Sequence, residues 1–289
     1  MAVRPEDLWP VDERYRELYE TFVNTGRESA QALDAVIVSI ARNSMPVLEN
    51  TAELVRELMT GFNSCRWFVY ENDSEDGTAE YLDSLPFVTV QHDTLGGLDS
   101  RGFEKERTER LAGCRTRCQD WVRKHAADTQ WTIVLDTDPP GGFSVDGVFN
   151  SIGWLSWKSM DSCPRRPGGM ASYSLWKSGG AVAGYDSWAA RPTCWWEDRR
   201  DEIGFAWFHS FLPPVGSYPL AMNSAFGGLC VYKTEAFLSP QARYRGDDCE
   251  HVGLHRGMAQ DGYQMWMNPG CRYIAYWTDD DPSEEAVAA

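Results

Sequence analysis

The chain has 289 residues, of which 43% are hydrophobic, so it can bury a full core. This length and composition exclude a disordered chain, a collagen and a small disulfide scaffold. Asp and Glu number 43 against 27 Lys and Arg, which gives a formal net charge of -16. Such a charge repels polyanions, so a nucleic-acid partner would need a local basic cleft.

The first 34 residues predict an N-terminal helical extension, because residues 12–30 carry apolar side chains at helical spacing. From residue 35 onward, short apolar runs alternate with helical patterns. Strands are predicted at 35–40, 66–70, 87–90 and 131–135, and helices at 47–60, around 81–82 and over 104–126. This alternation predicts an α/β fold with a mostly parallel central sheet flanked by helices.

The alternation breaks down after Phe149. The Gly-, Ser-, Pro- and Trp-rich segment 156–184 predicts loops that cover the sheet, with a short strand at 181–183. The uncharged stretch 203–232 predicts buried loop and short strand, because prolines and glycines interrupt it too often for a spanning helix. A helix is expected at 248–262 and a strand at 263–267, and the acidic tail 279–289 is expected to be disordered.

Eight cysteines form no CxxC pair and no zinc-finger spacing. Several lie inside apolar runs, so we expect buried, reduced thiols. No signal peptide opens the sequence. Together these features predict a soluble cytoplasmic protein.

Polar residues follow three of the predicted strands, at the edge of an open α/β sheet where ligands bind. No GxGxxG or GxxxxGK[ST] loop is present, which argues against the common dinucleotide and P-loop sites. The three strand-end segments are Ala41-Arg42-Asn43, Glu71-Asn72-Asp73 with the turn that follows it, and Asp136-Thr137-Asp138.

Asp136 and Asp138 could hold Mg²⁺ or Mn²⁺, which take one or two carboxylates and complete their shell with water and phosphates. The alternative is that an Asp caps the turn into the Pro-Pro-Gly-Gly segment that follows. Glu71 and Asp73 could accept hydrogen bonds from a base or ribose, but the same segment is also a good turn and helix start.

The helix predicted at 104–126 carries arginines at 107, 110, 115 and 117 among acidic residues. They form either a solvated, salt-bridged face or, in part, a set that points at a diphosphate. Glu250 begins the later helix and could be a cap, a metal ligand or a general base. His251 and His255 share one helical face, which suits a metal, although ordinary core or surface histidines are more common.

Five stretches resemble the GT-A glycosyltransferases and, more narrowly, the cryptococcal capsule-associated α-1,3-mannosyltransferase family. Their order and spacing agree over roughly residues 35–277. They are Ile40-Ala41-Arg42-Asn43; Tyr70-Glu71-Asn72-Asp73-Ser74-Glu75-Asp76-Gly77-Thr78; Arg107-x-x-x-Leu111-Ala112-x-x-Arg115; Tyr185-Asp186-x-Trp188-x-x-Arg191; and Glu250 to Gly262, closing on Met267-Asn268-Pro269.

The resemblance implies a GT-A fold in which residues 35–150 bind a nucleotide-sugar and residues 151–278 form a loop-rich, acceptor-binding and catalytic half. The donor would be a GDP- or UDP-hexose, with Mn²⁺ or Mg²⁺ held by Asp138 and Asp136. Donor-binding residues implied are Ala41, Arg42, Asn43, Glu71, Asp73, Arg107, Arg115 and Asp136. Substrate-binding residues implied are Trp188, Asn223, Gly227 and Gly228, and the catalytic carboxylates implied are Glu250 and Asp186.

The chain departs from the family pattern in three ways. The fungal members are membrane anchored, whereas no spanning helix is predicted here, which suggests a bacterial or viral relative, in a bacterial cytoplasm or in that of a virus-infected host. The family often has a single Asp after the fourth strand, and the late histidine that many GT-A enzymes use as a third metal ligand is missing from residues 272–277. The implied reaction transfers a hexose, mannose or glucose, to an acceptor hydroxyl. The hydroxyl could belong to a glycan, a lipid-linked sugar, a protein or a hydroxymethylated DNA base flipped from its stack. A nucleotidyltransferase or a non-catalytic carbohydrate-binding protein are the alternatives.

Overall fold

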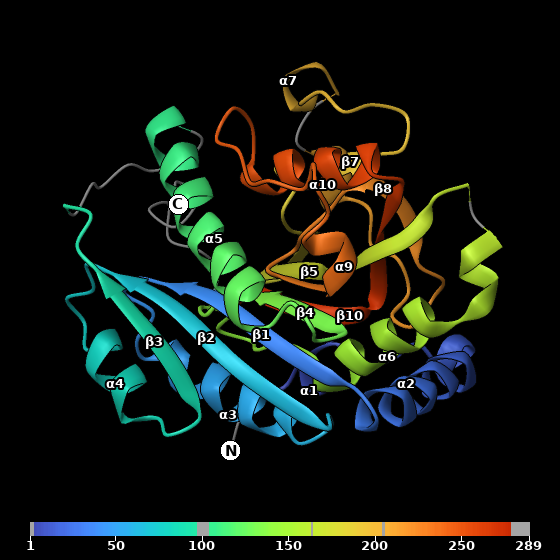
Figure 1. Ribbon diagram of the computed structural model, residues 1–289. Coiled ribbons are helices and arrows are strands. Elements are labelled where there is room, and N and C mark those ends of the chain that lie inside the picture. The colour runs from blue at the N-terminus through green and yellow to red at the C-terminus, as the bar shows by residue number, and fades with distance from the viewer. Residues whose placement is uncertain (1–2, 97–103, 163, 204–205, 279–289) are drawn as a thin grey trace.

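A mixed ten-stranded sheet forms the centre of the computed structural model, which describes residues 3–96, 104–162, 164–203 and 206–278 (Figure 1). The strand order is β3-β2-β1-β4-β9-β5-β10-β8-β7, and β6 pairs with β5. The first four strands pair in parallel, as predicted. They are β1 (Asp34–Ala41), β2 (Ser64–Asn72), β3 (Val88–Asp93) and β4 (Trp131–Leu135).

The second half of the chain extends the same sheet, mostly with antiparallel pairs. Strand β9 joins the two halves, because it runs antiparallel to both β4 and β5. Strands β5 and β10 pair in parallel. These strands are β5 (Arg166–Ser178), β6 (Ala181–Gly184), β7 (Arg191–Pro192), β8 (Leu220–Ser224), β9 (Leu229–Lys233) and β10 (Tyr263–Thr278).

The prediction of loops over 156–184 is wrong for its central part, where β5 lies in the middle of the sheet. Gly168 and Gly169, which lie within β5, do not mark a turn but make room for neighbouring aromatic side chains. A Cβ on Gly168 would lie 2.7 Å from Cβ of Tyr263, and one on Gly169 would lie 2.7 Å from Cδ1 of Tyr232. Glycine inside a strand often marks such close approach.

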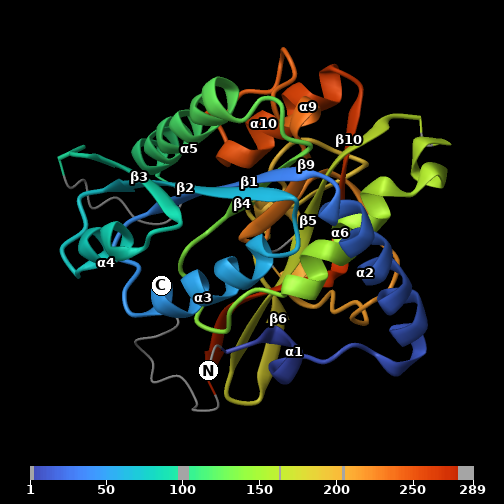
Figure 2. The same cartoon turned by 60° about the horizontal axis from the view of Figure 1, so that its bottom comes forward.

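Helices cover both faces of the sheet (Figures 1 and 2). Side chains on alternating strand positions divide between two cores, so Ile37 packs with the α2, α3 and α6 side and Val36 with the α5 and α10 side. The helices are α1 (Pro5–Leu8), α2 (Arg16–Gln31), α3 (Val47–Met59), α4 (Thr78–Ser84), α5 (Lys105–His125), α6 (Val145–Ser156), α7 (Arg200–Ile203), α8 (Ala206–His209), α9 (Thr234–Phe237) and α10 (Glu250–Gln260), with the 3-10 turns Glu13–Tyr15 and Lys158–Ser162.

Helix α6 has no counterpart in the sequence prediction. It is buried along almost its whole circumference, so it lacks the polar face that gives an amphipathic helix its period. It packs against α2 through two glycines. A Cβ on Gly26 would lie 1.7 Å from the Phe149 carbonyl oxygen, and one on Gly153 would lie 2.1 Å from that of Phe22.

Three smaller expectations can be compared with the structure. The cysteines of the described part are free thiols, and they are buried except Cys65, which is partly exposed, and Cys194, which is exposed. Along the same residues, no helix is long and apolar enough to cross a membrane. The acidic tail 279–289 lies outside the described residues.

The α2–α6 crossing predicts opposite effects for two glycine-to-alanine substitutions. Gly26→Ala should lower the free energy of unfolding by about 1–3 kcal/mol, because the added methyl meets backbone atoms that cannot move aside. Gly113→Ala in α5 is the control: no atom lies within 4 Å of its Cβ, so it should raise that free energy by about 0.5–1 kcal/mol. Urea denaturation measures both, and equal shifts in one direction would contradict this packing.

Candidate active site

A cavity of about 420 Å³ lies beyond the carboxyl ends of β1, β2 and β4, where the sequence predicted a ligand site. The two halves of the chain both contribute to its wall. Of the residues predicted for the site, it is lined by Ala41, Arg42, Arg107, Arg115, Asp136, Asp138, Asp186, Trp188, Gly228 and Glu250. Arg110 and His251, whose roles the sequence left open, also line it. So do residues that the sequence did not assign to the site, among them Ser44, Asn72, Tyr185, Phe226, Cys249 and Tyr273.

Arg115 joins the two halves of the cavity floor. It lies on α5 with a side chain that is only 4% exposed, and its guanidinium forms an ion pair with Asp136 at the end of β4. Its Nε lies 3.8 Å from Oε1 of Glu250 at the start of α10. The guanidinium also lies over the ring of Phe226, 5.1 Å from its centroid. One buried cation therefore holds a carboxylate from each half.

Asp136 and Asp138 form the acidic wall of the cavity. Asp138 is accessible from the cavity, and the Tyr273 hydroxyl donates to its Oδ1 at 3.4 Å. The surrounding protein and the neighbouring Asp136 raise the pKa of Asp138 above its usual value, which a bound cation would reverse. Within the described ranges no three His, Cys, Asp or Glu side chains are grouped to hold a metal. These residues fit a cation held by two carboxylates and completed by water and phosphates, rather than an all-protein cage.

Glu250 is the most deeply placed carboxylate of the cavity. It is 4% exposed and begins α10. Burial raises its pKa, and the favourable effect of Arg115 only partly opposes that shift. A buried carboxylate with a raised pKa at a cavity wall is a candidate for accepting or donating a proton.

Asp186 fixes the loop beside the cavity. Its Oδ1 accepts a hydrogen bond from the Ala189 N–H at 3.2 Å and its Oδ2 accepts one from the Gly227 N–H at 2.7 Å. Burial raises the pKa of Asp186 to about 7, while the two backbone donors oppose the rise. Gly227 and Gly228 have φ of 66° and 79°, a region that favours glycine. Asp186 thus holds Gly227 with one carboxylate oxygen and the backbone at Ala189 with the other.

Three predicted donor-binding residues shape the loop after β2 and are not among the residues that line the cavity. Glu71 accepts a hydrogen bond from the Ser74 N–H at 3.0 Å and pairs with Nδ1 of His92 at 2.7 Å. Asp73 accepts from the Leu95 N–H at 3.0 Å, and Asn43 accepts from the Glu75 N–H at 2.8 Å. Their assignment to the base, ribose or phosphates stays a prediction, since these contacts engage the side chains within the protein.

The remaining predicted residues fall into two groups. Trp188 lines the cavity with Arg107 stacked on its ring at 5.5 Å. Asn223 instead donates to the Trp195 carbonyl at 2.7 Å and is absent from the lining. Of the helix α5 arginines, 107, 110 and 115 line the cavity, whereas Arg117 pairs with Asp93 at 3.5 Å. The arginines of α5 are therefore divided between the cavity and the surface, and whether the cavity group binds a diphosphate stays a prediction.

The histidine pair on α10 is not a metal site. His255 is fully buried, with Nδ1 hydrogen-bonded to Ser224 Oγ and Nε2 to the Tyr232 hydroxyl, both at 2.8 Å. Burial lowers the pKa of His255 to about 3, so it stays neutral. Because both of its nitrogens are engaged, His255 cannot serve as a ligand.

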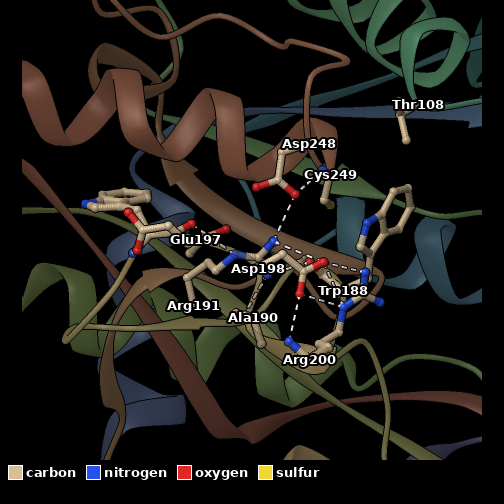
Figure 3. A network of polar contacts seen from close by, with 12 residues as sticks. Thr108, Trp188, Ala190, Arg191, Glu197, Asp198, Arg200, Asp248 and Cys249 are labelled. Carbon is tan, nitrogen blue, oxygen red and sulfur yellow. Dashed lines mark hydrogen bonds and ion pairs between the residues drawn. The ribbon is translucent and has the colours of Figure 1, made fainter. Parts of the chain in front are cut away.

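A buried arginine ties the Trp188 loop to the start of α10 (Figure 3). Arg191 is 1% exposed and donates to the carbonyls of Trp188 at 2.8 Å, Ala190 at 3.0 Å and Trp196 at 3.1 Å. It also donates to Oδ1 of Asp248 at 2.9 Å. The same oxygen accepts from the Cys249 N–H at 2.7 Å, one residue before Glu250. The network thus fixes the Trp188 loop and helix α10 relative to each other.

The sequence matches no known protein family and no curated protein. In structure the chain is similar to GalNAc-T7 with UDP, GalNAc and Mn²⁺ (14% identity, TM-score 0.51, 96% of this chain and 55% of that one). It also aligns with TarS of S. aureus (10%, 0.49, 84% and 60%) and with the mannosyltransferase PcManGT of Pyrobaculum calidifontis in complex with GDP-Man and Mn²⁺ (12%, 0.44, 90% and 66%). The chain thus spans less than two thirds of each of these structures. Its topology and the first of these similarities define a GT-A glycosyltransferase fold.

The Arg191 network predicts a large stability effect from one substitution. Arg191→Met should lower the free energy of unfolding by about 3 kcal/mol, because it leaves Asp248 and three carbonyls without their donor. Arg199→Met, in the same segment but 44% exposed, should change it by less than about 0.5 kcal/mol. Guanidinium denaturation distinguishes the two, and similar values for both variants would argue against the network.

Asp186 predicts a pH-dependent contribution to stability. Its pKa is about 7 in the fold against 3.8 as the ordinary value, so the folded state retains a proton that the unfolded state loses. This contribution is complete below pH 3.8 and disappears as the pH rises through about 7. Relative to Asp186→Asn, the wild type should lose about 1–3 kcal/mol of unfolding free energy between about pH 5 and pH 8. If the unfolding free energies of the two proteins, measured by denaturation, change in parallel with pH, this contribution of Asp186 is refuted.

Proposed function

We propose that this chain is a glycosyltransferase that transfers a hexose from a nucleotide-sugar to an acceptor hydroxyl. The observation that supports this proposal is the cavity in which arginines of α5, the Asp136/Asp138 pair and Glu250 face one another. Such a site joins groups for binding a diphosphate to a group for handling a proton. In a protein with the GT-A fold, sugar transfer from a nucleotide-sugar is the simplest explanation for this combination of groups.

The leaving group of the reaction is a nucleoside diphosphate, which gains negative charge as the glycosidic bond breaks. Arg42, Arg107 and Arg110 line the cavity and supply positive charge on a chain whose net charge is -16. Fixed charges that stabilise the charge developing in a transition state usually contribute most to catalysis. A Mn²⁺ or Mg²⁺ ion, held by Asp136 and Asp138, would neutralise the phosphates further.

Glu250 is the residue we propose to handle the proton. In an inverting reaction, the acceptor oxygen bonds to the anomeric carbon, the carbon–phosphate-oxygen bond breaks, and the acceptor proton passes to Glu250. In a retaining reaction the departing phosphate takes that proton, and Glu250 stabilises positive charge on the sugar. The engagement of both Asp186 oxygens by backbone N–H groups favours a positioning role for Asp186 over a catalytic one.

The motif resemblance and the cavity lining are the grounds on which we propose a donor and an acceptor. The resemblance to capsule-associated mannosyltransferases favours a GDP- or UDP-hexose, with mannose or glucose as the transferred sugar. Trp188 and Tyr185 line the cavity, and Tyr185 is 49% exposed. Flat apolar faces of sugars or bases stack on such rings. The acceptor is therefore proposed as a hydroxyl-bearing ring, a glycan in the first place and a hydroxymethylated base in the second.

A panel of nucleotide-sugars tests this proposal directly. With Mn²⁺ present, UDP-glucose or GDP-mannose should raise the melting temperature, because a ligand of the folded state stabilises it by mass action. Glu250→Gln should retain this shift but lower transfer, followed by release of the nucleoside diphosphate, by about 10²- to 10⁴-fold. Asp138→Asn should reduce the Mn²⁺-dependent part of the shift.

Asp120→Asn serves as the control, because Asp120 is exposed on α5 and pairs only with Arg123 within the described part of the chain. It should match the wild type in binding and transfer. If no nucleotide-sugar shifts the melting temperature of the wild type, with or without Mn²⁺, the proposed function is refuted.

A further inference from the structure

His251 is a buried histidine at the cavity whose ring nitrogens are unsatisfied. It is 2% exposed, and its ring stacks on Phe226 with centroids 3.6 Å apart and planes inclined by 15°. Among the residues that the structure describes, neither Nδ1 nor Nε2 has a hydrogen-bond partner. Glu250 lies close by, with Oε1 3.4 Å from Nε2.

Arg115 shows the same property on the other side of Glu250. Its Nη2 is paired with Asp136, but within the described ranges Nε and Nη1 have no hydrogen-bond partner. Glu250 thus lies between an imidazole and a guanidinium, each with unused polar atoms. All three residues line the same cavity.

Unsatisfied polar atoms of this kind are costly and call for an explanation. Leaving a buried donor or acceptor unpaired costs about 1–3 kcal/mol, and native proteins do so rarely. His255, one helical turn further along α10, is equally buried and has both nitrogens hydrogen-bonded. The fold therefore satisfies a histidine where its role is structural. At the cavity, the two nitrogens of His251 lack such partners among the described residues, as expected of a group that pairs with a ligand.

The chemistry of these groups specifies hydroxyls as their partners. Burial and the nearby Arg115 lower the pKa of His251 well below its usual value, so the ring is neutral, with one donor and one acceptor nitrogen. Arg115 adds donors and Glu250 adds an acceptor. Neighbouring hydroxyls of a sugar both donate and accept hydrogen bonds. They can therefore pair with the donors of His251 and Arg115 and with the acceptors of His251 and Glu250 without bringing in a further charge.

The position of the cluster favours the sugar of the donor. The Arg115 side chain contacts Asp136 with one nitrogen and lies 3.8 Å from Glu250 with another, so the two carboxylates are separated by about one guanidinium. If the diphosphate lies by Asp136 and Asp138, the group that adjoins it at Glu250 and His251 is the hexose. We propose that His251, together with Arg115, binds hydroxyls of the transferred hexose and so selects which hexose the enzyme uses. This inference rests on the function proposed above.

The test compares a sugar nucleotide with its own nucleotide. Calorimetry would give the Kd of UDP, UDP-glucose, GDP and GDP-mannose, each with Mn²⁺, for the wild type and His251→Phe. Phenylalanine retains a flat ring for stacking on Phe226 but removes both nitrogens. For whichever pair the wild type binds, the sugar nucleotide should bind the variant about 3- to 10-fold more weakly, with the nucleotide alone within about 2-fold.

Three controls sharpen the comparison. His209→Phe changes a histidine that is not among the cavity-lining residues and should leave every Kd within about 2-fold. His251→Gln keeps a donor and an acceptor and should recover part of the lost affinity. Removing a hexose hydroxyl that His251 contacts should weaken binding to the wild type by a similar 3- to 10-fold, but should not weaken binding to His251→Phe further.

The outcomes separate this inference from the proposed function. If the wild type binds neither nucleotide nor sugar nucleotide, the proposed function fails and this inference with it. If the wild type binds but His251→Phe binds the sugar nucleotide equally well, or loses the nucleotide to the same extent, only the inference is overturned. Should His251→Phe fail to fold, His251→Gln and single-hydroxyl deletions in the donor decide the point: unchanged affinity for all of them would overturn it.

Discussion

The buried contact of Arg115 with Asp136 and Glu250 is the constraint on which the site depends. It joins α5, the end of β4 and the start of α10, three elements that are far apart in the sequence. Burial raises the pKa of Glu250, and the guanidinium of Arg115 partly opposes that rise.

The second half of the sheet supplies the opposite wall of the cavity, which the parallel half lacks. Parallel strands bring Arg42 and Asp136 to one edge but offer no group on the opposite wall of the cavity. The antiparallel strand β9 brings the Gly227–Gly228 turn to that edge, where the Gly228 carbonyl accepts from the Asp136 N–H at 2.8 Å. Asp186 then holds Gly227, and Arg191 holds the start of α10. This wall of the cavity is therefore built from loops whose positions are set by buried polar contacts.

The sequence predicts the first half of the fold well because its signals are local. The β1 and β4 segments are apolar, buried strands, and α3 shows a clear amphipathic period, so each is recognisable alone. Strand β5 and helix α6 are not, because glycines in both serve close packing with residues distant in the chain. Within the site, strand-end position identified Asp136 and Arg42. It also singled out Glu71, whose engagement by His92 depends on β3 and could not be seen from the β2 segment.

Helix α10 shows why residue type and spacing could not settle the roles of its histidines. From sequence, His251 and His255 are equivalent members of one helical face. In the structure the second is hydrogen-bonded to Ser224 and Tyr232. The first lines the cavity, and its two buried nitrogens have no hydrogen-bond partner among the described residues. The difference arises from strands β8 and β9, which reach one histidine and not the other. Hydrogen bonding to the rest of the fold, which only the folded chain defines, is therefore what distinguishes the two histidines.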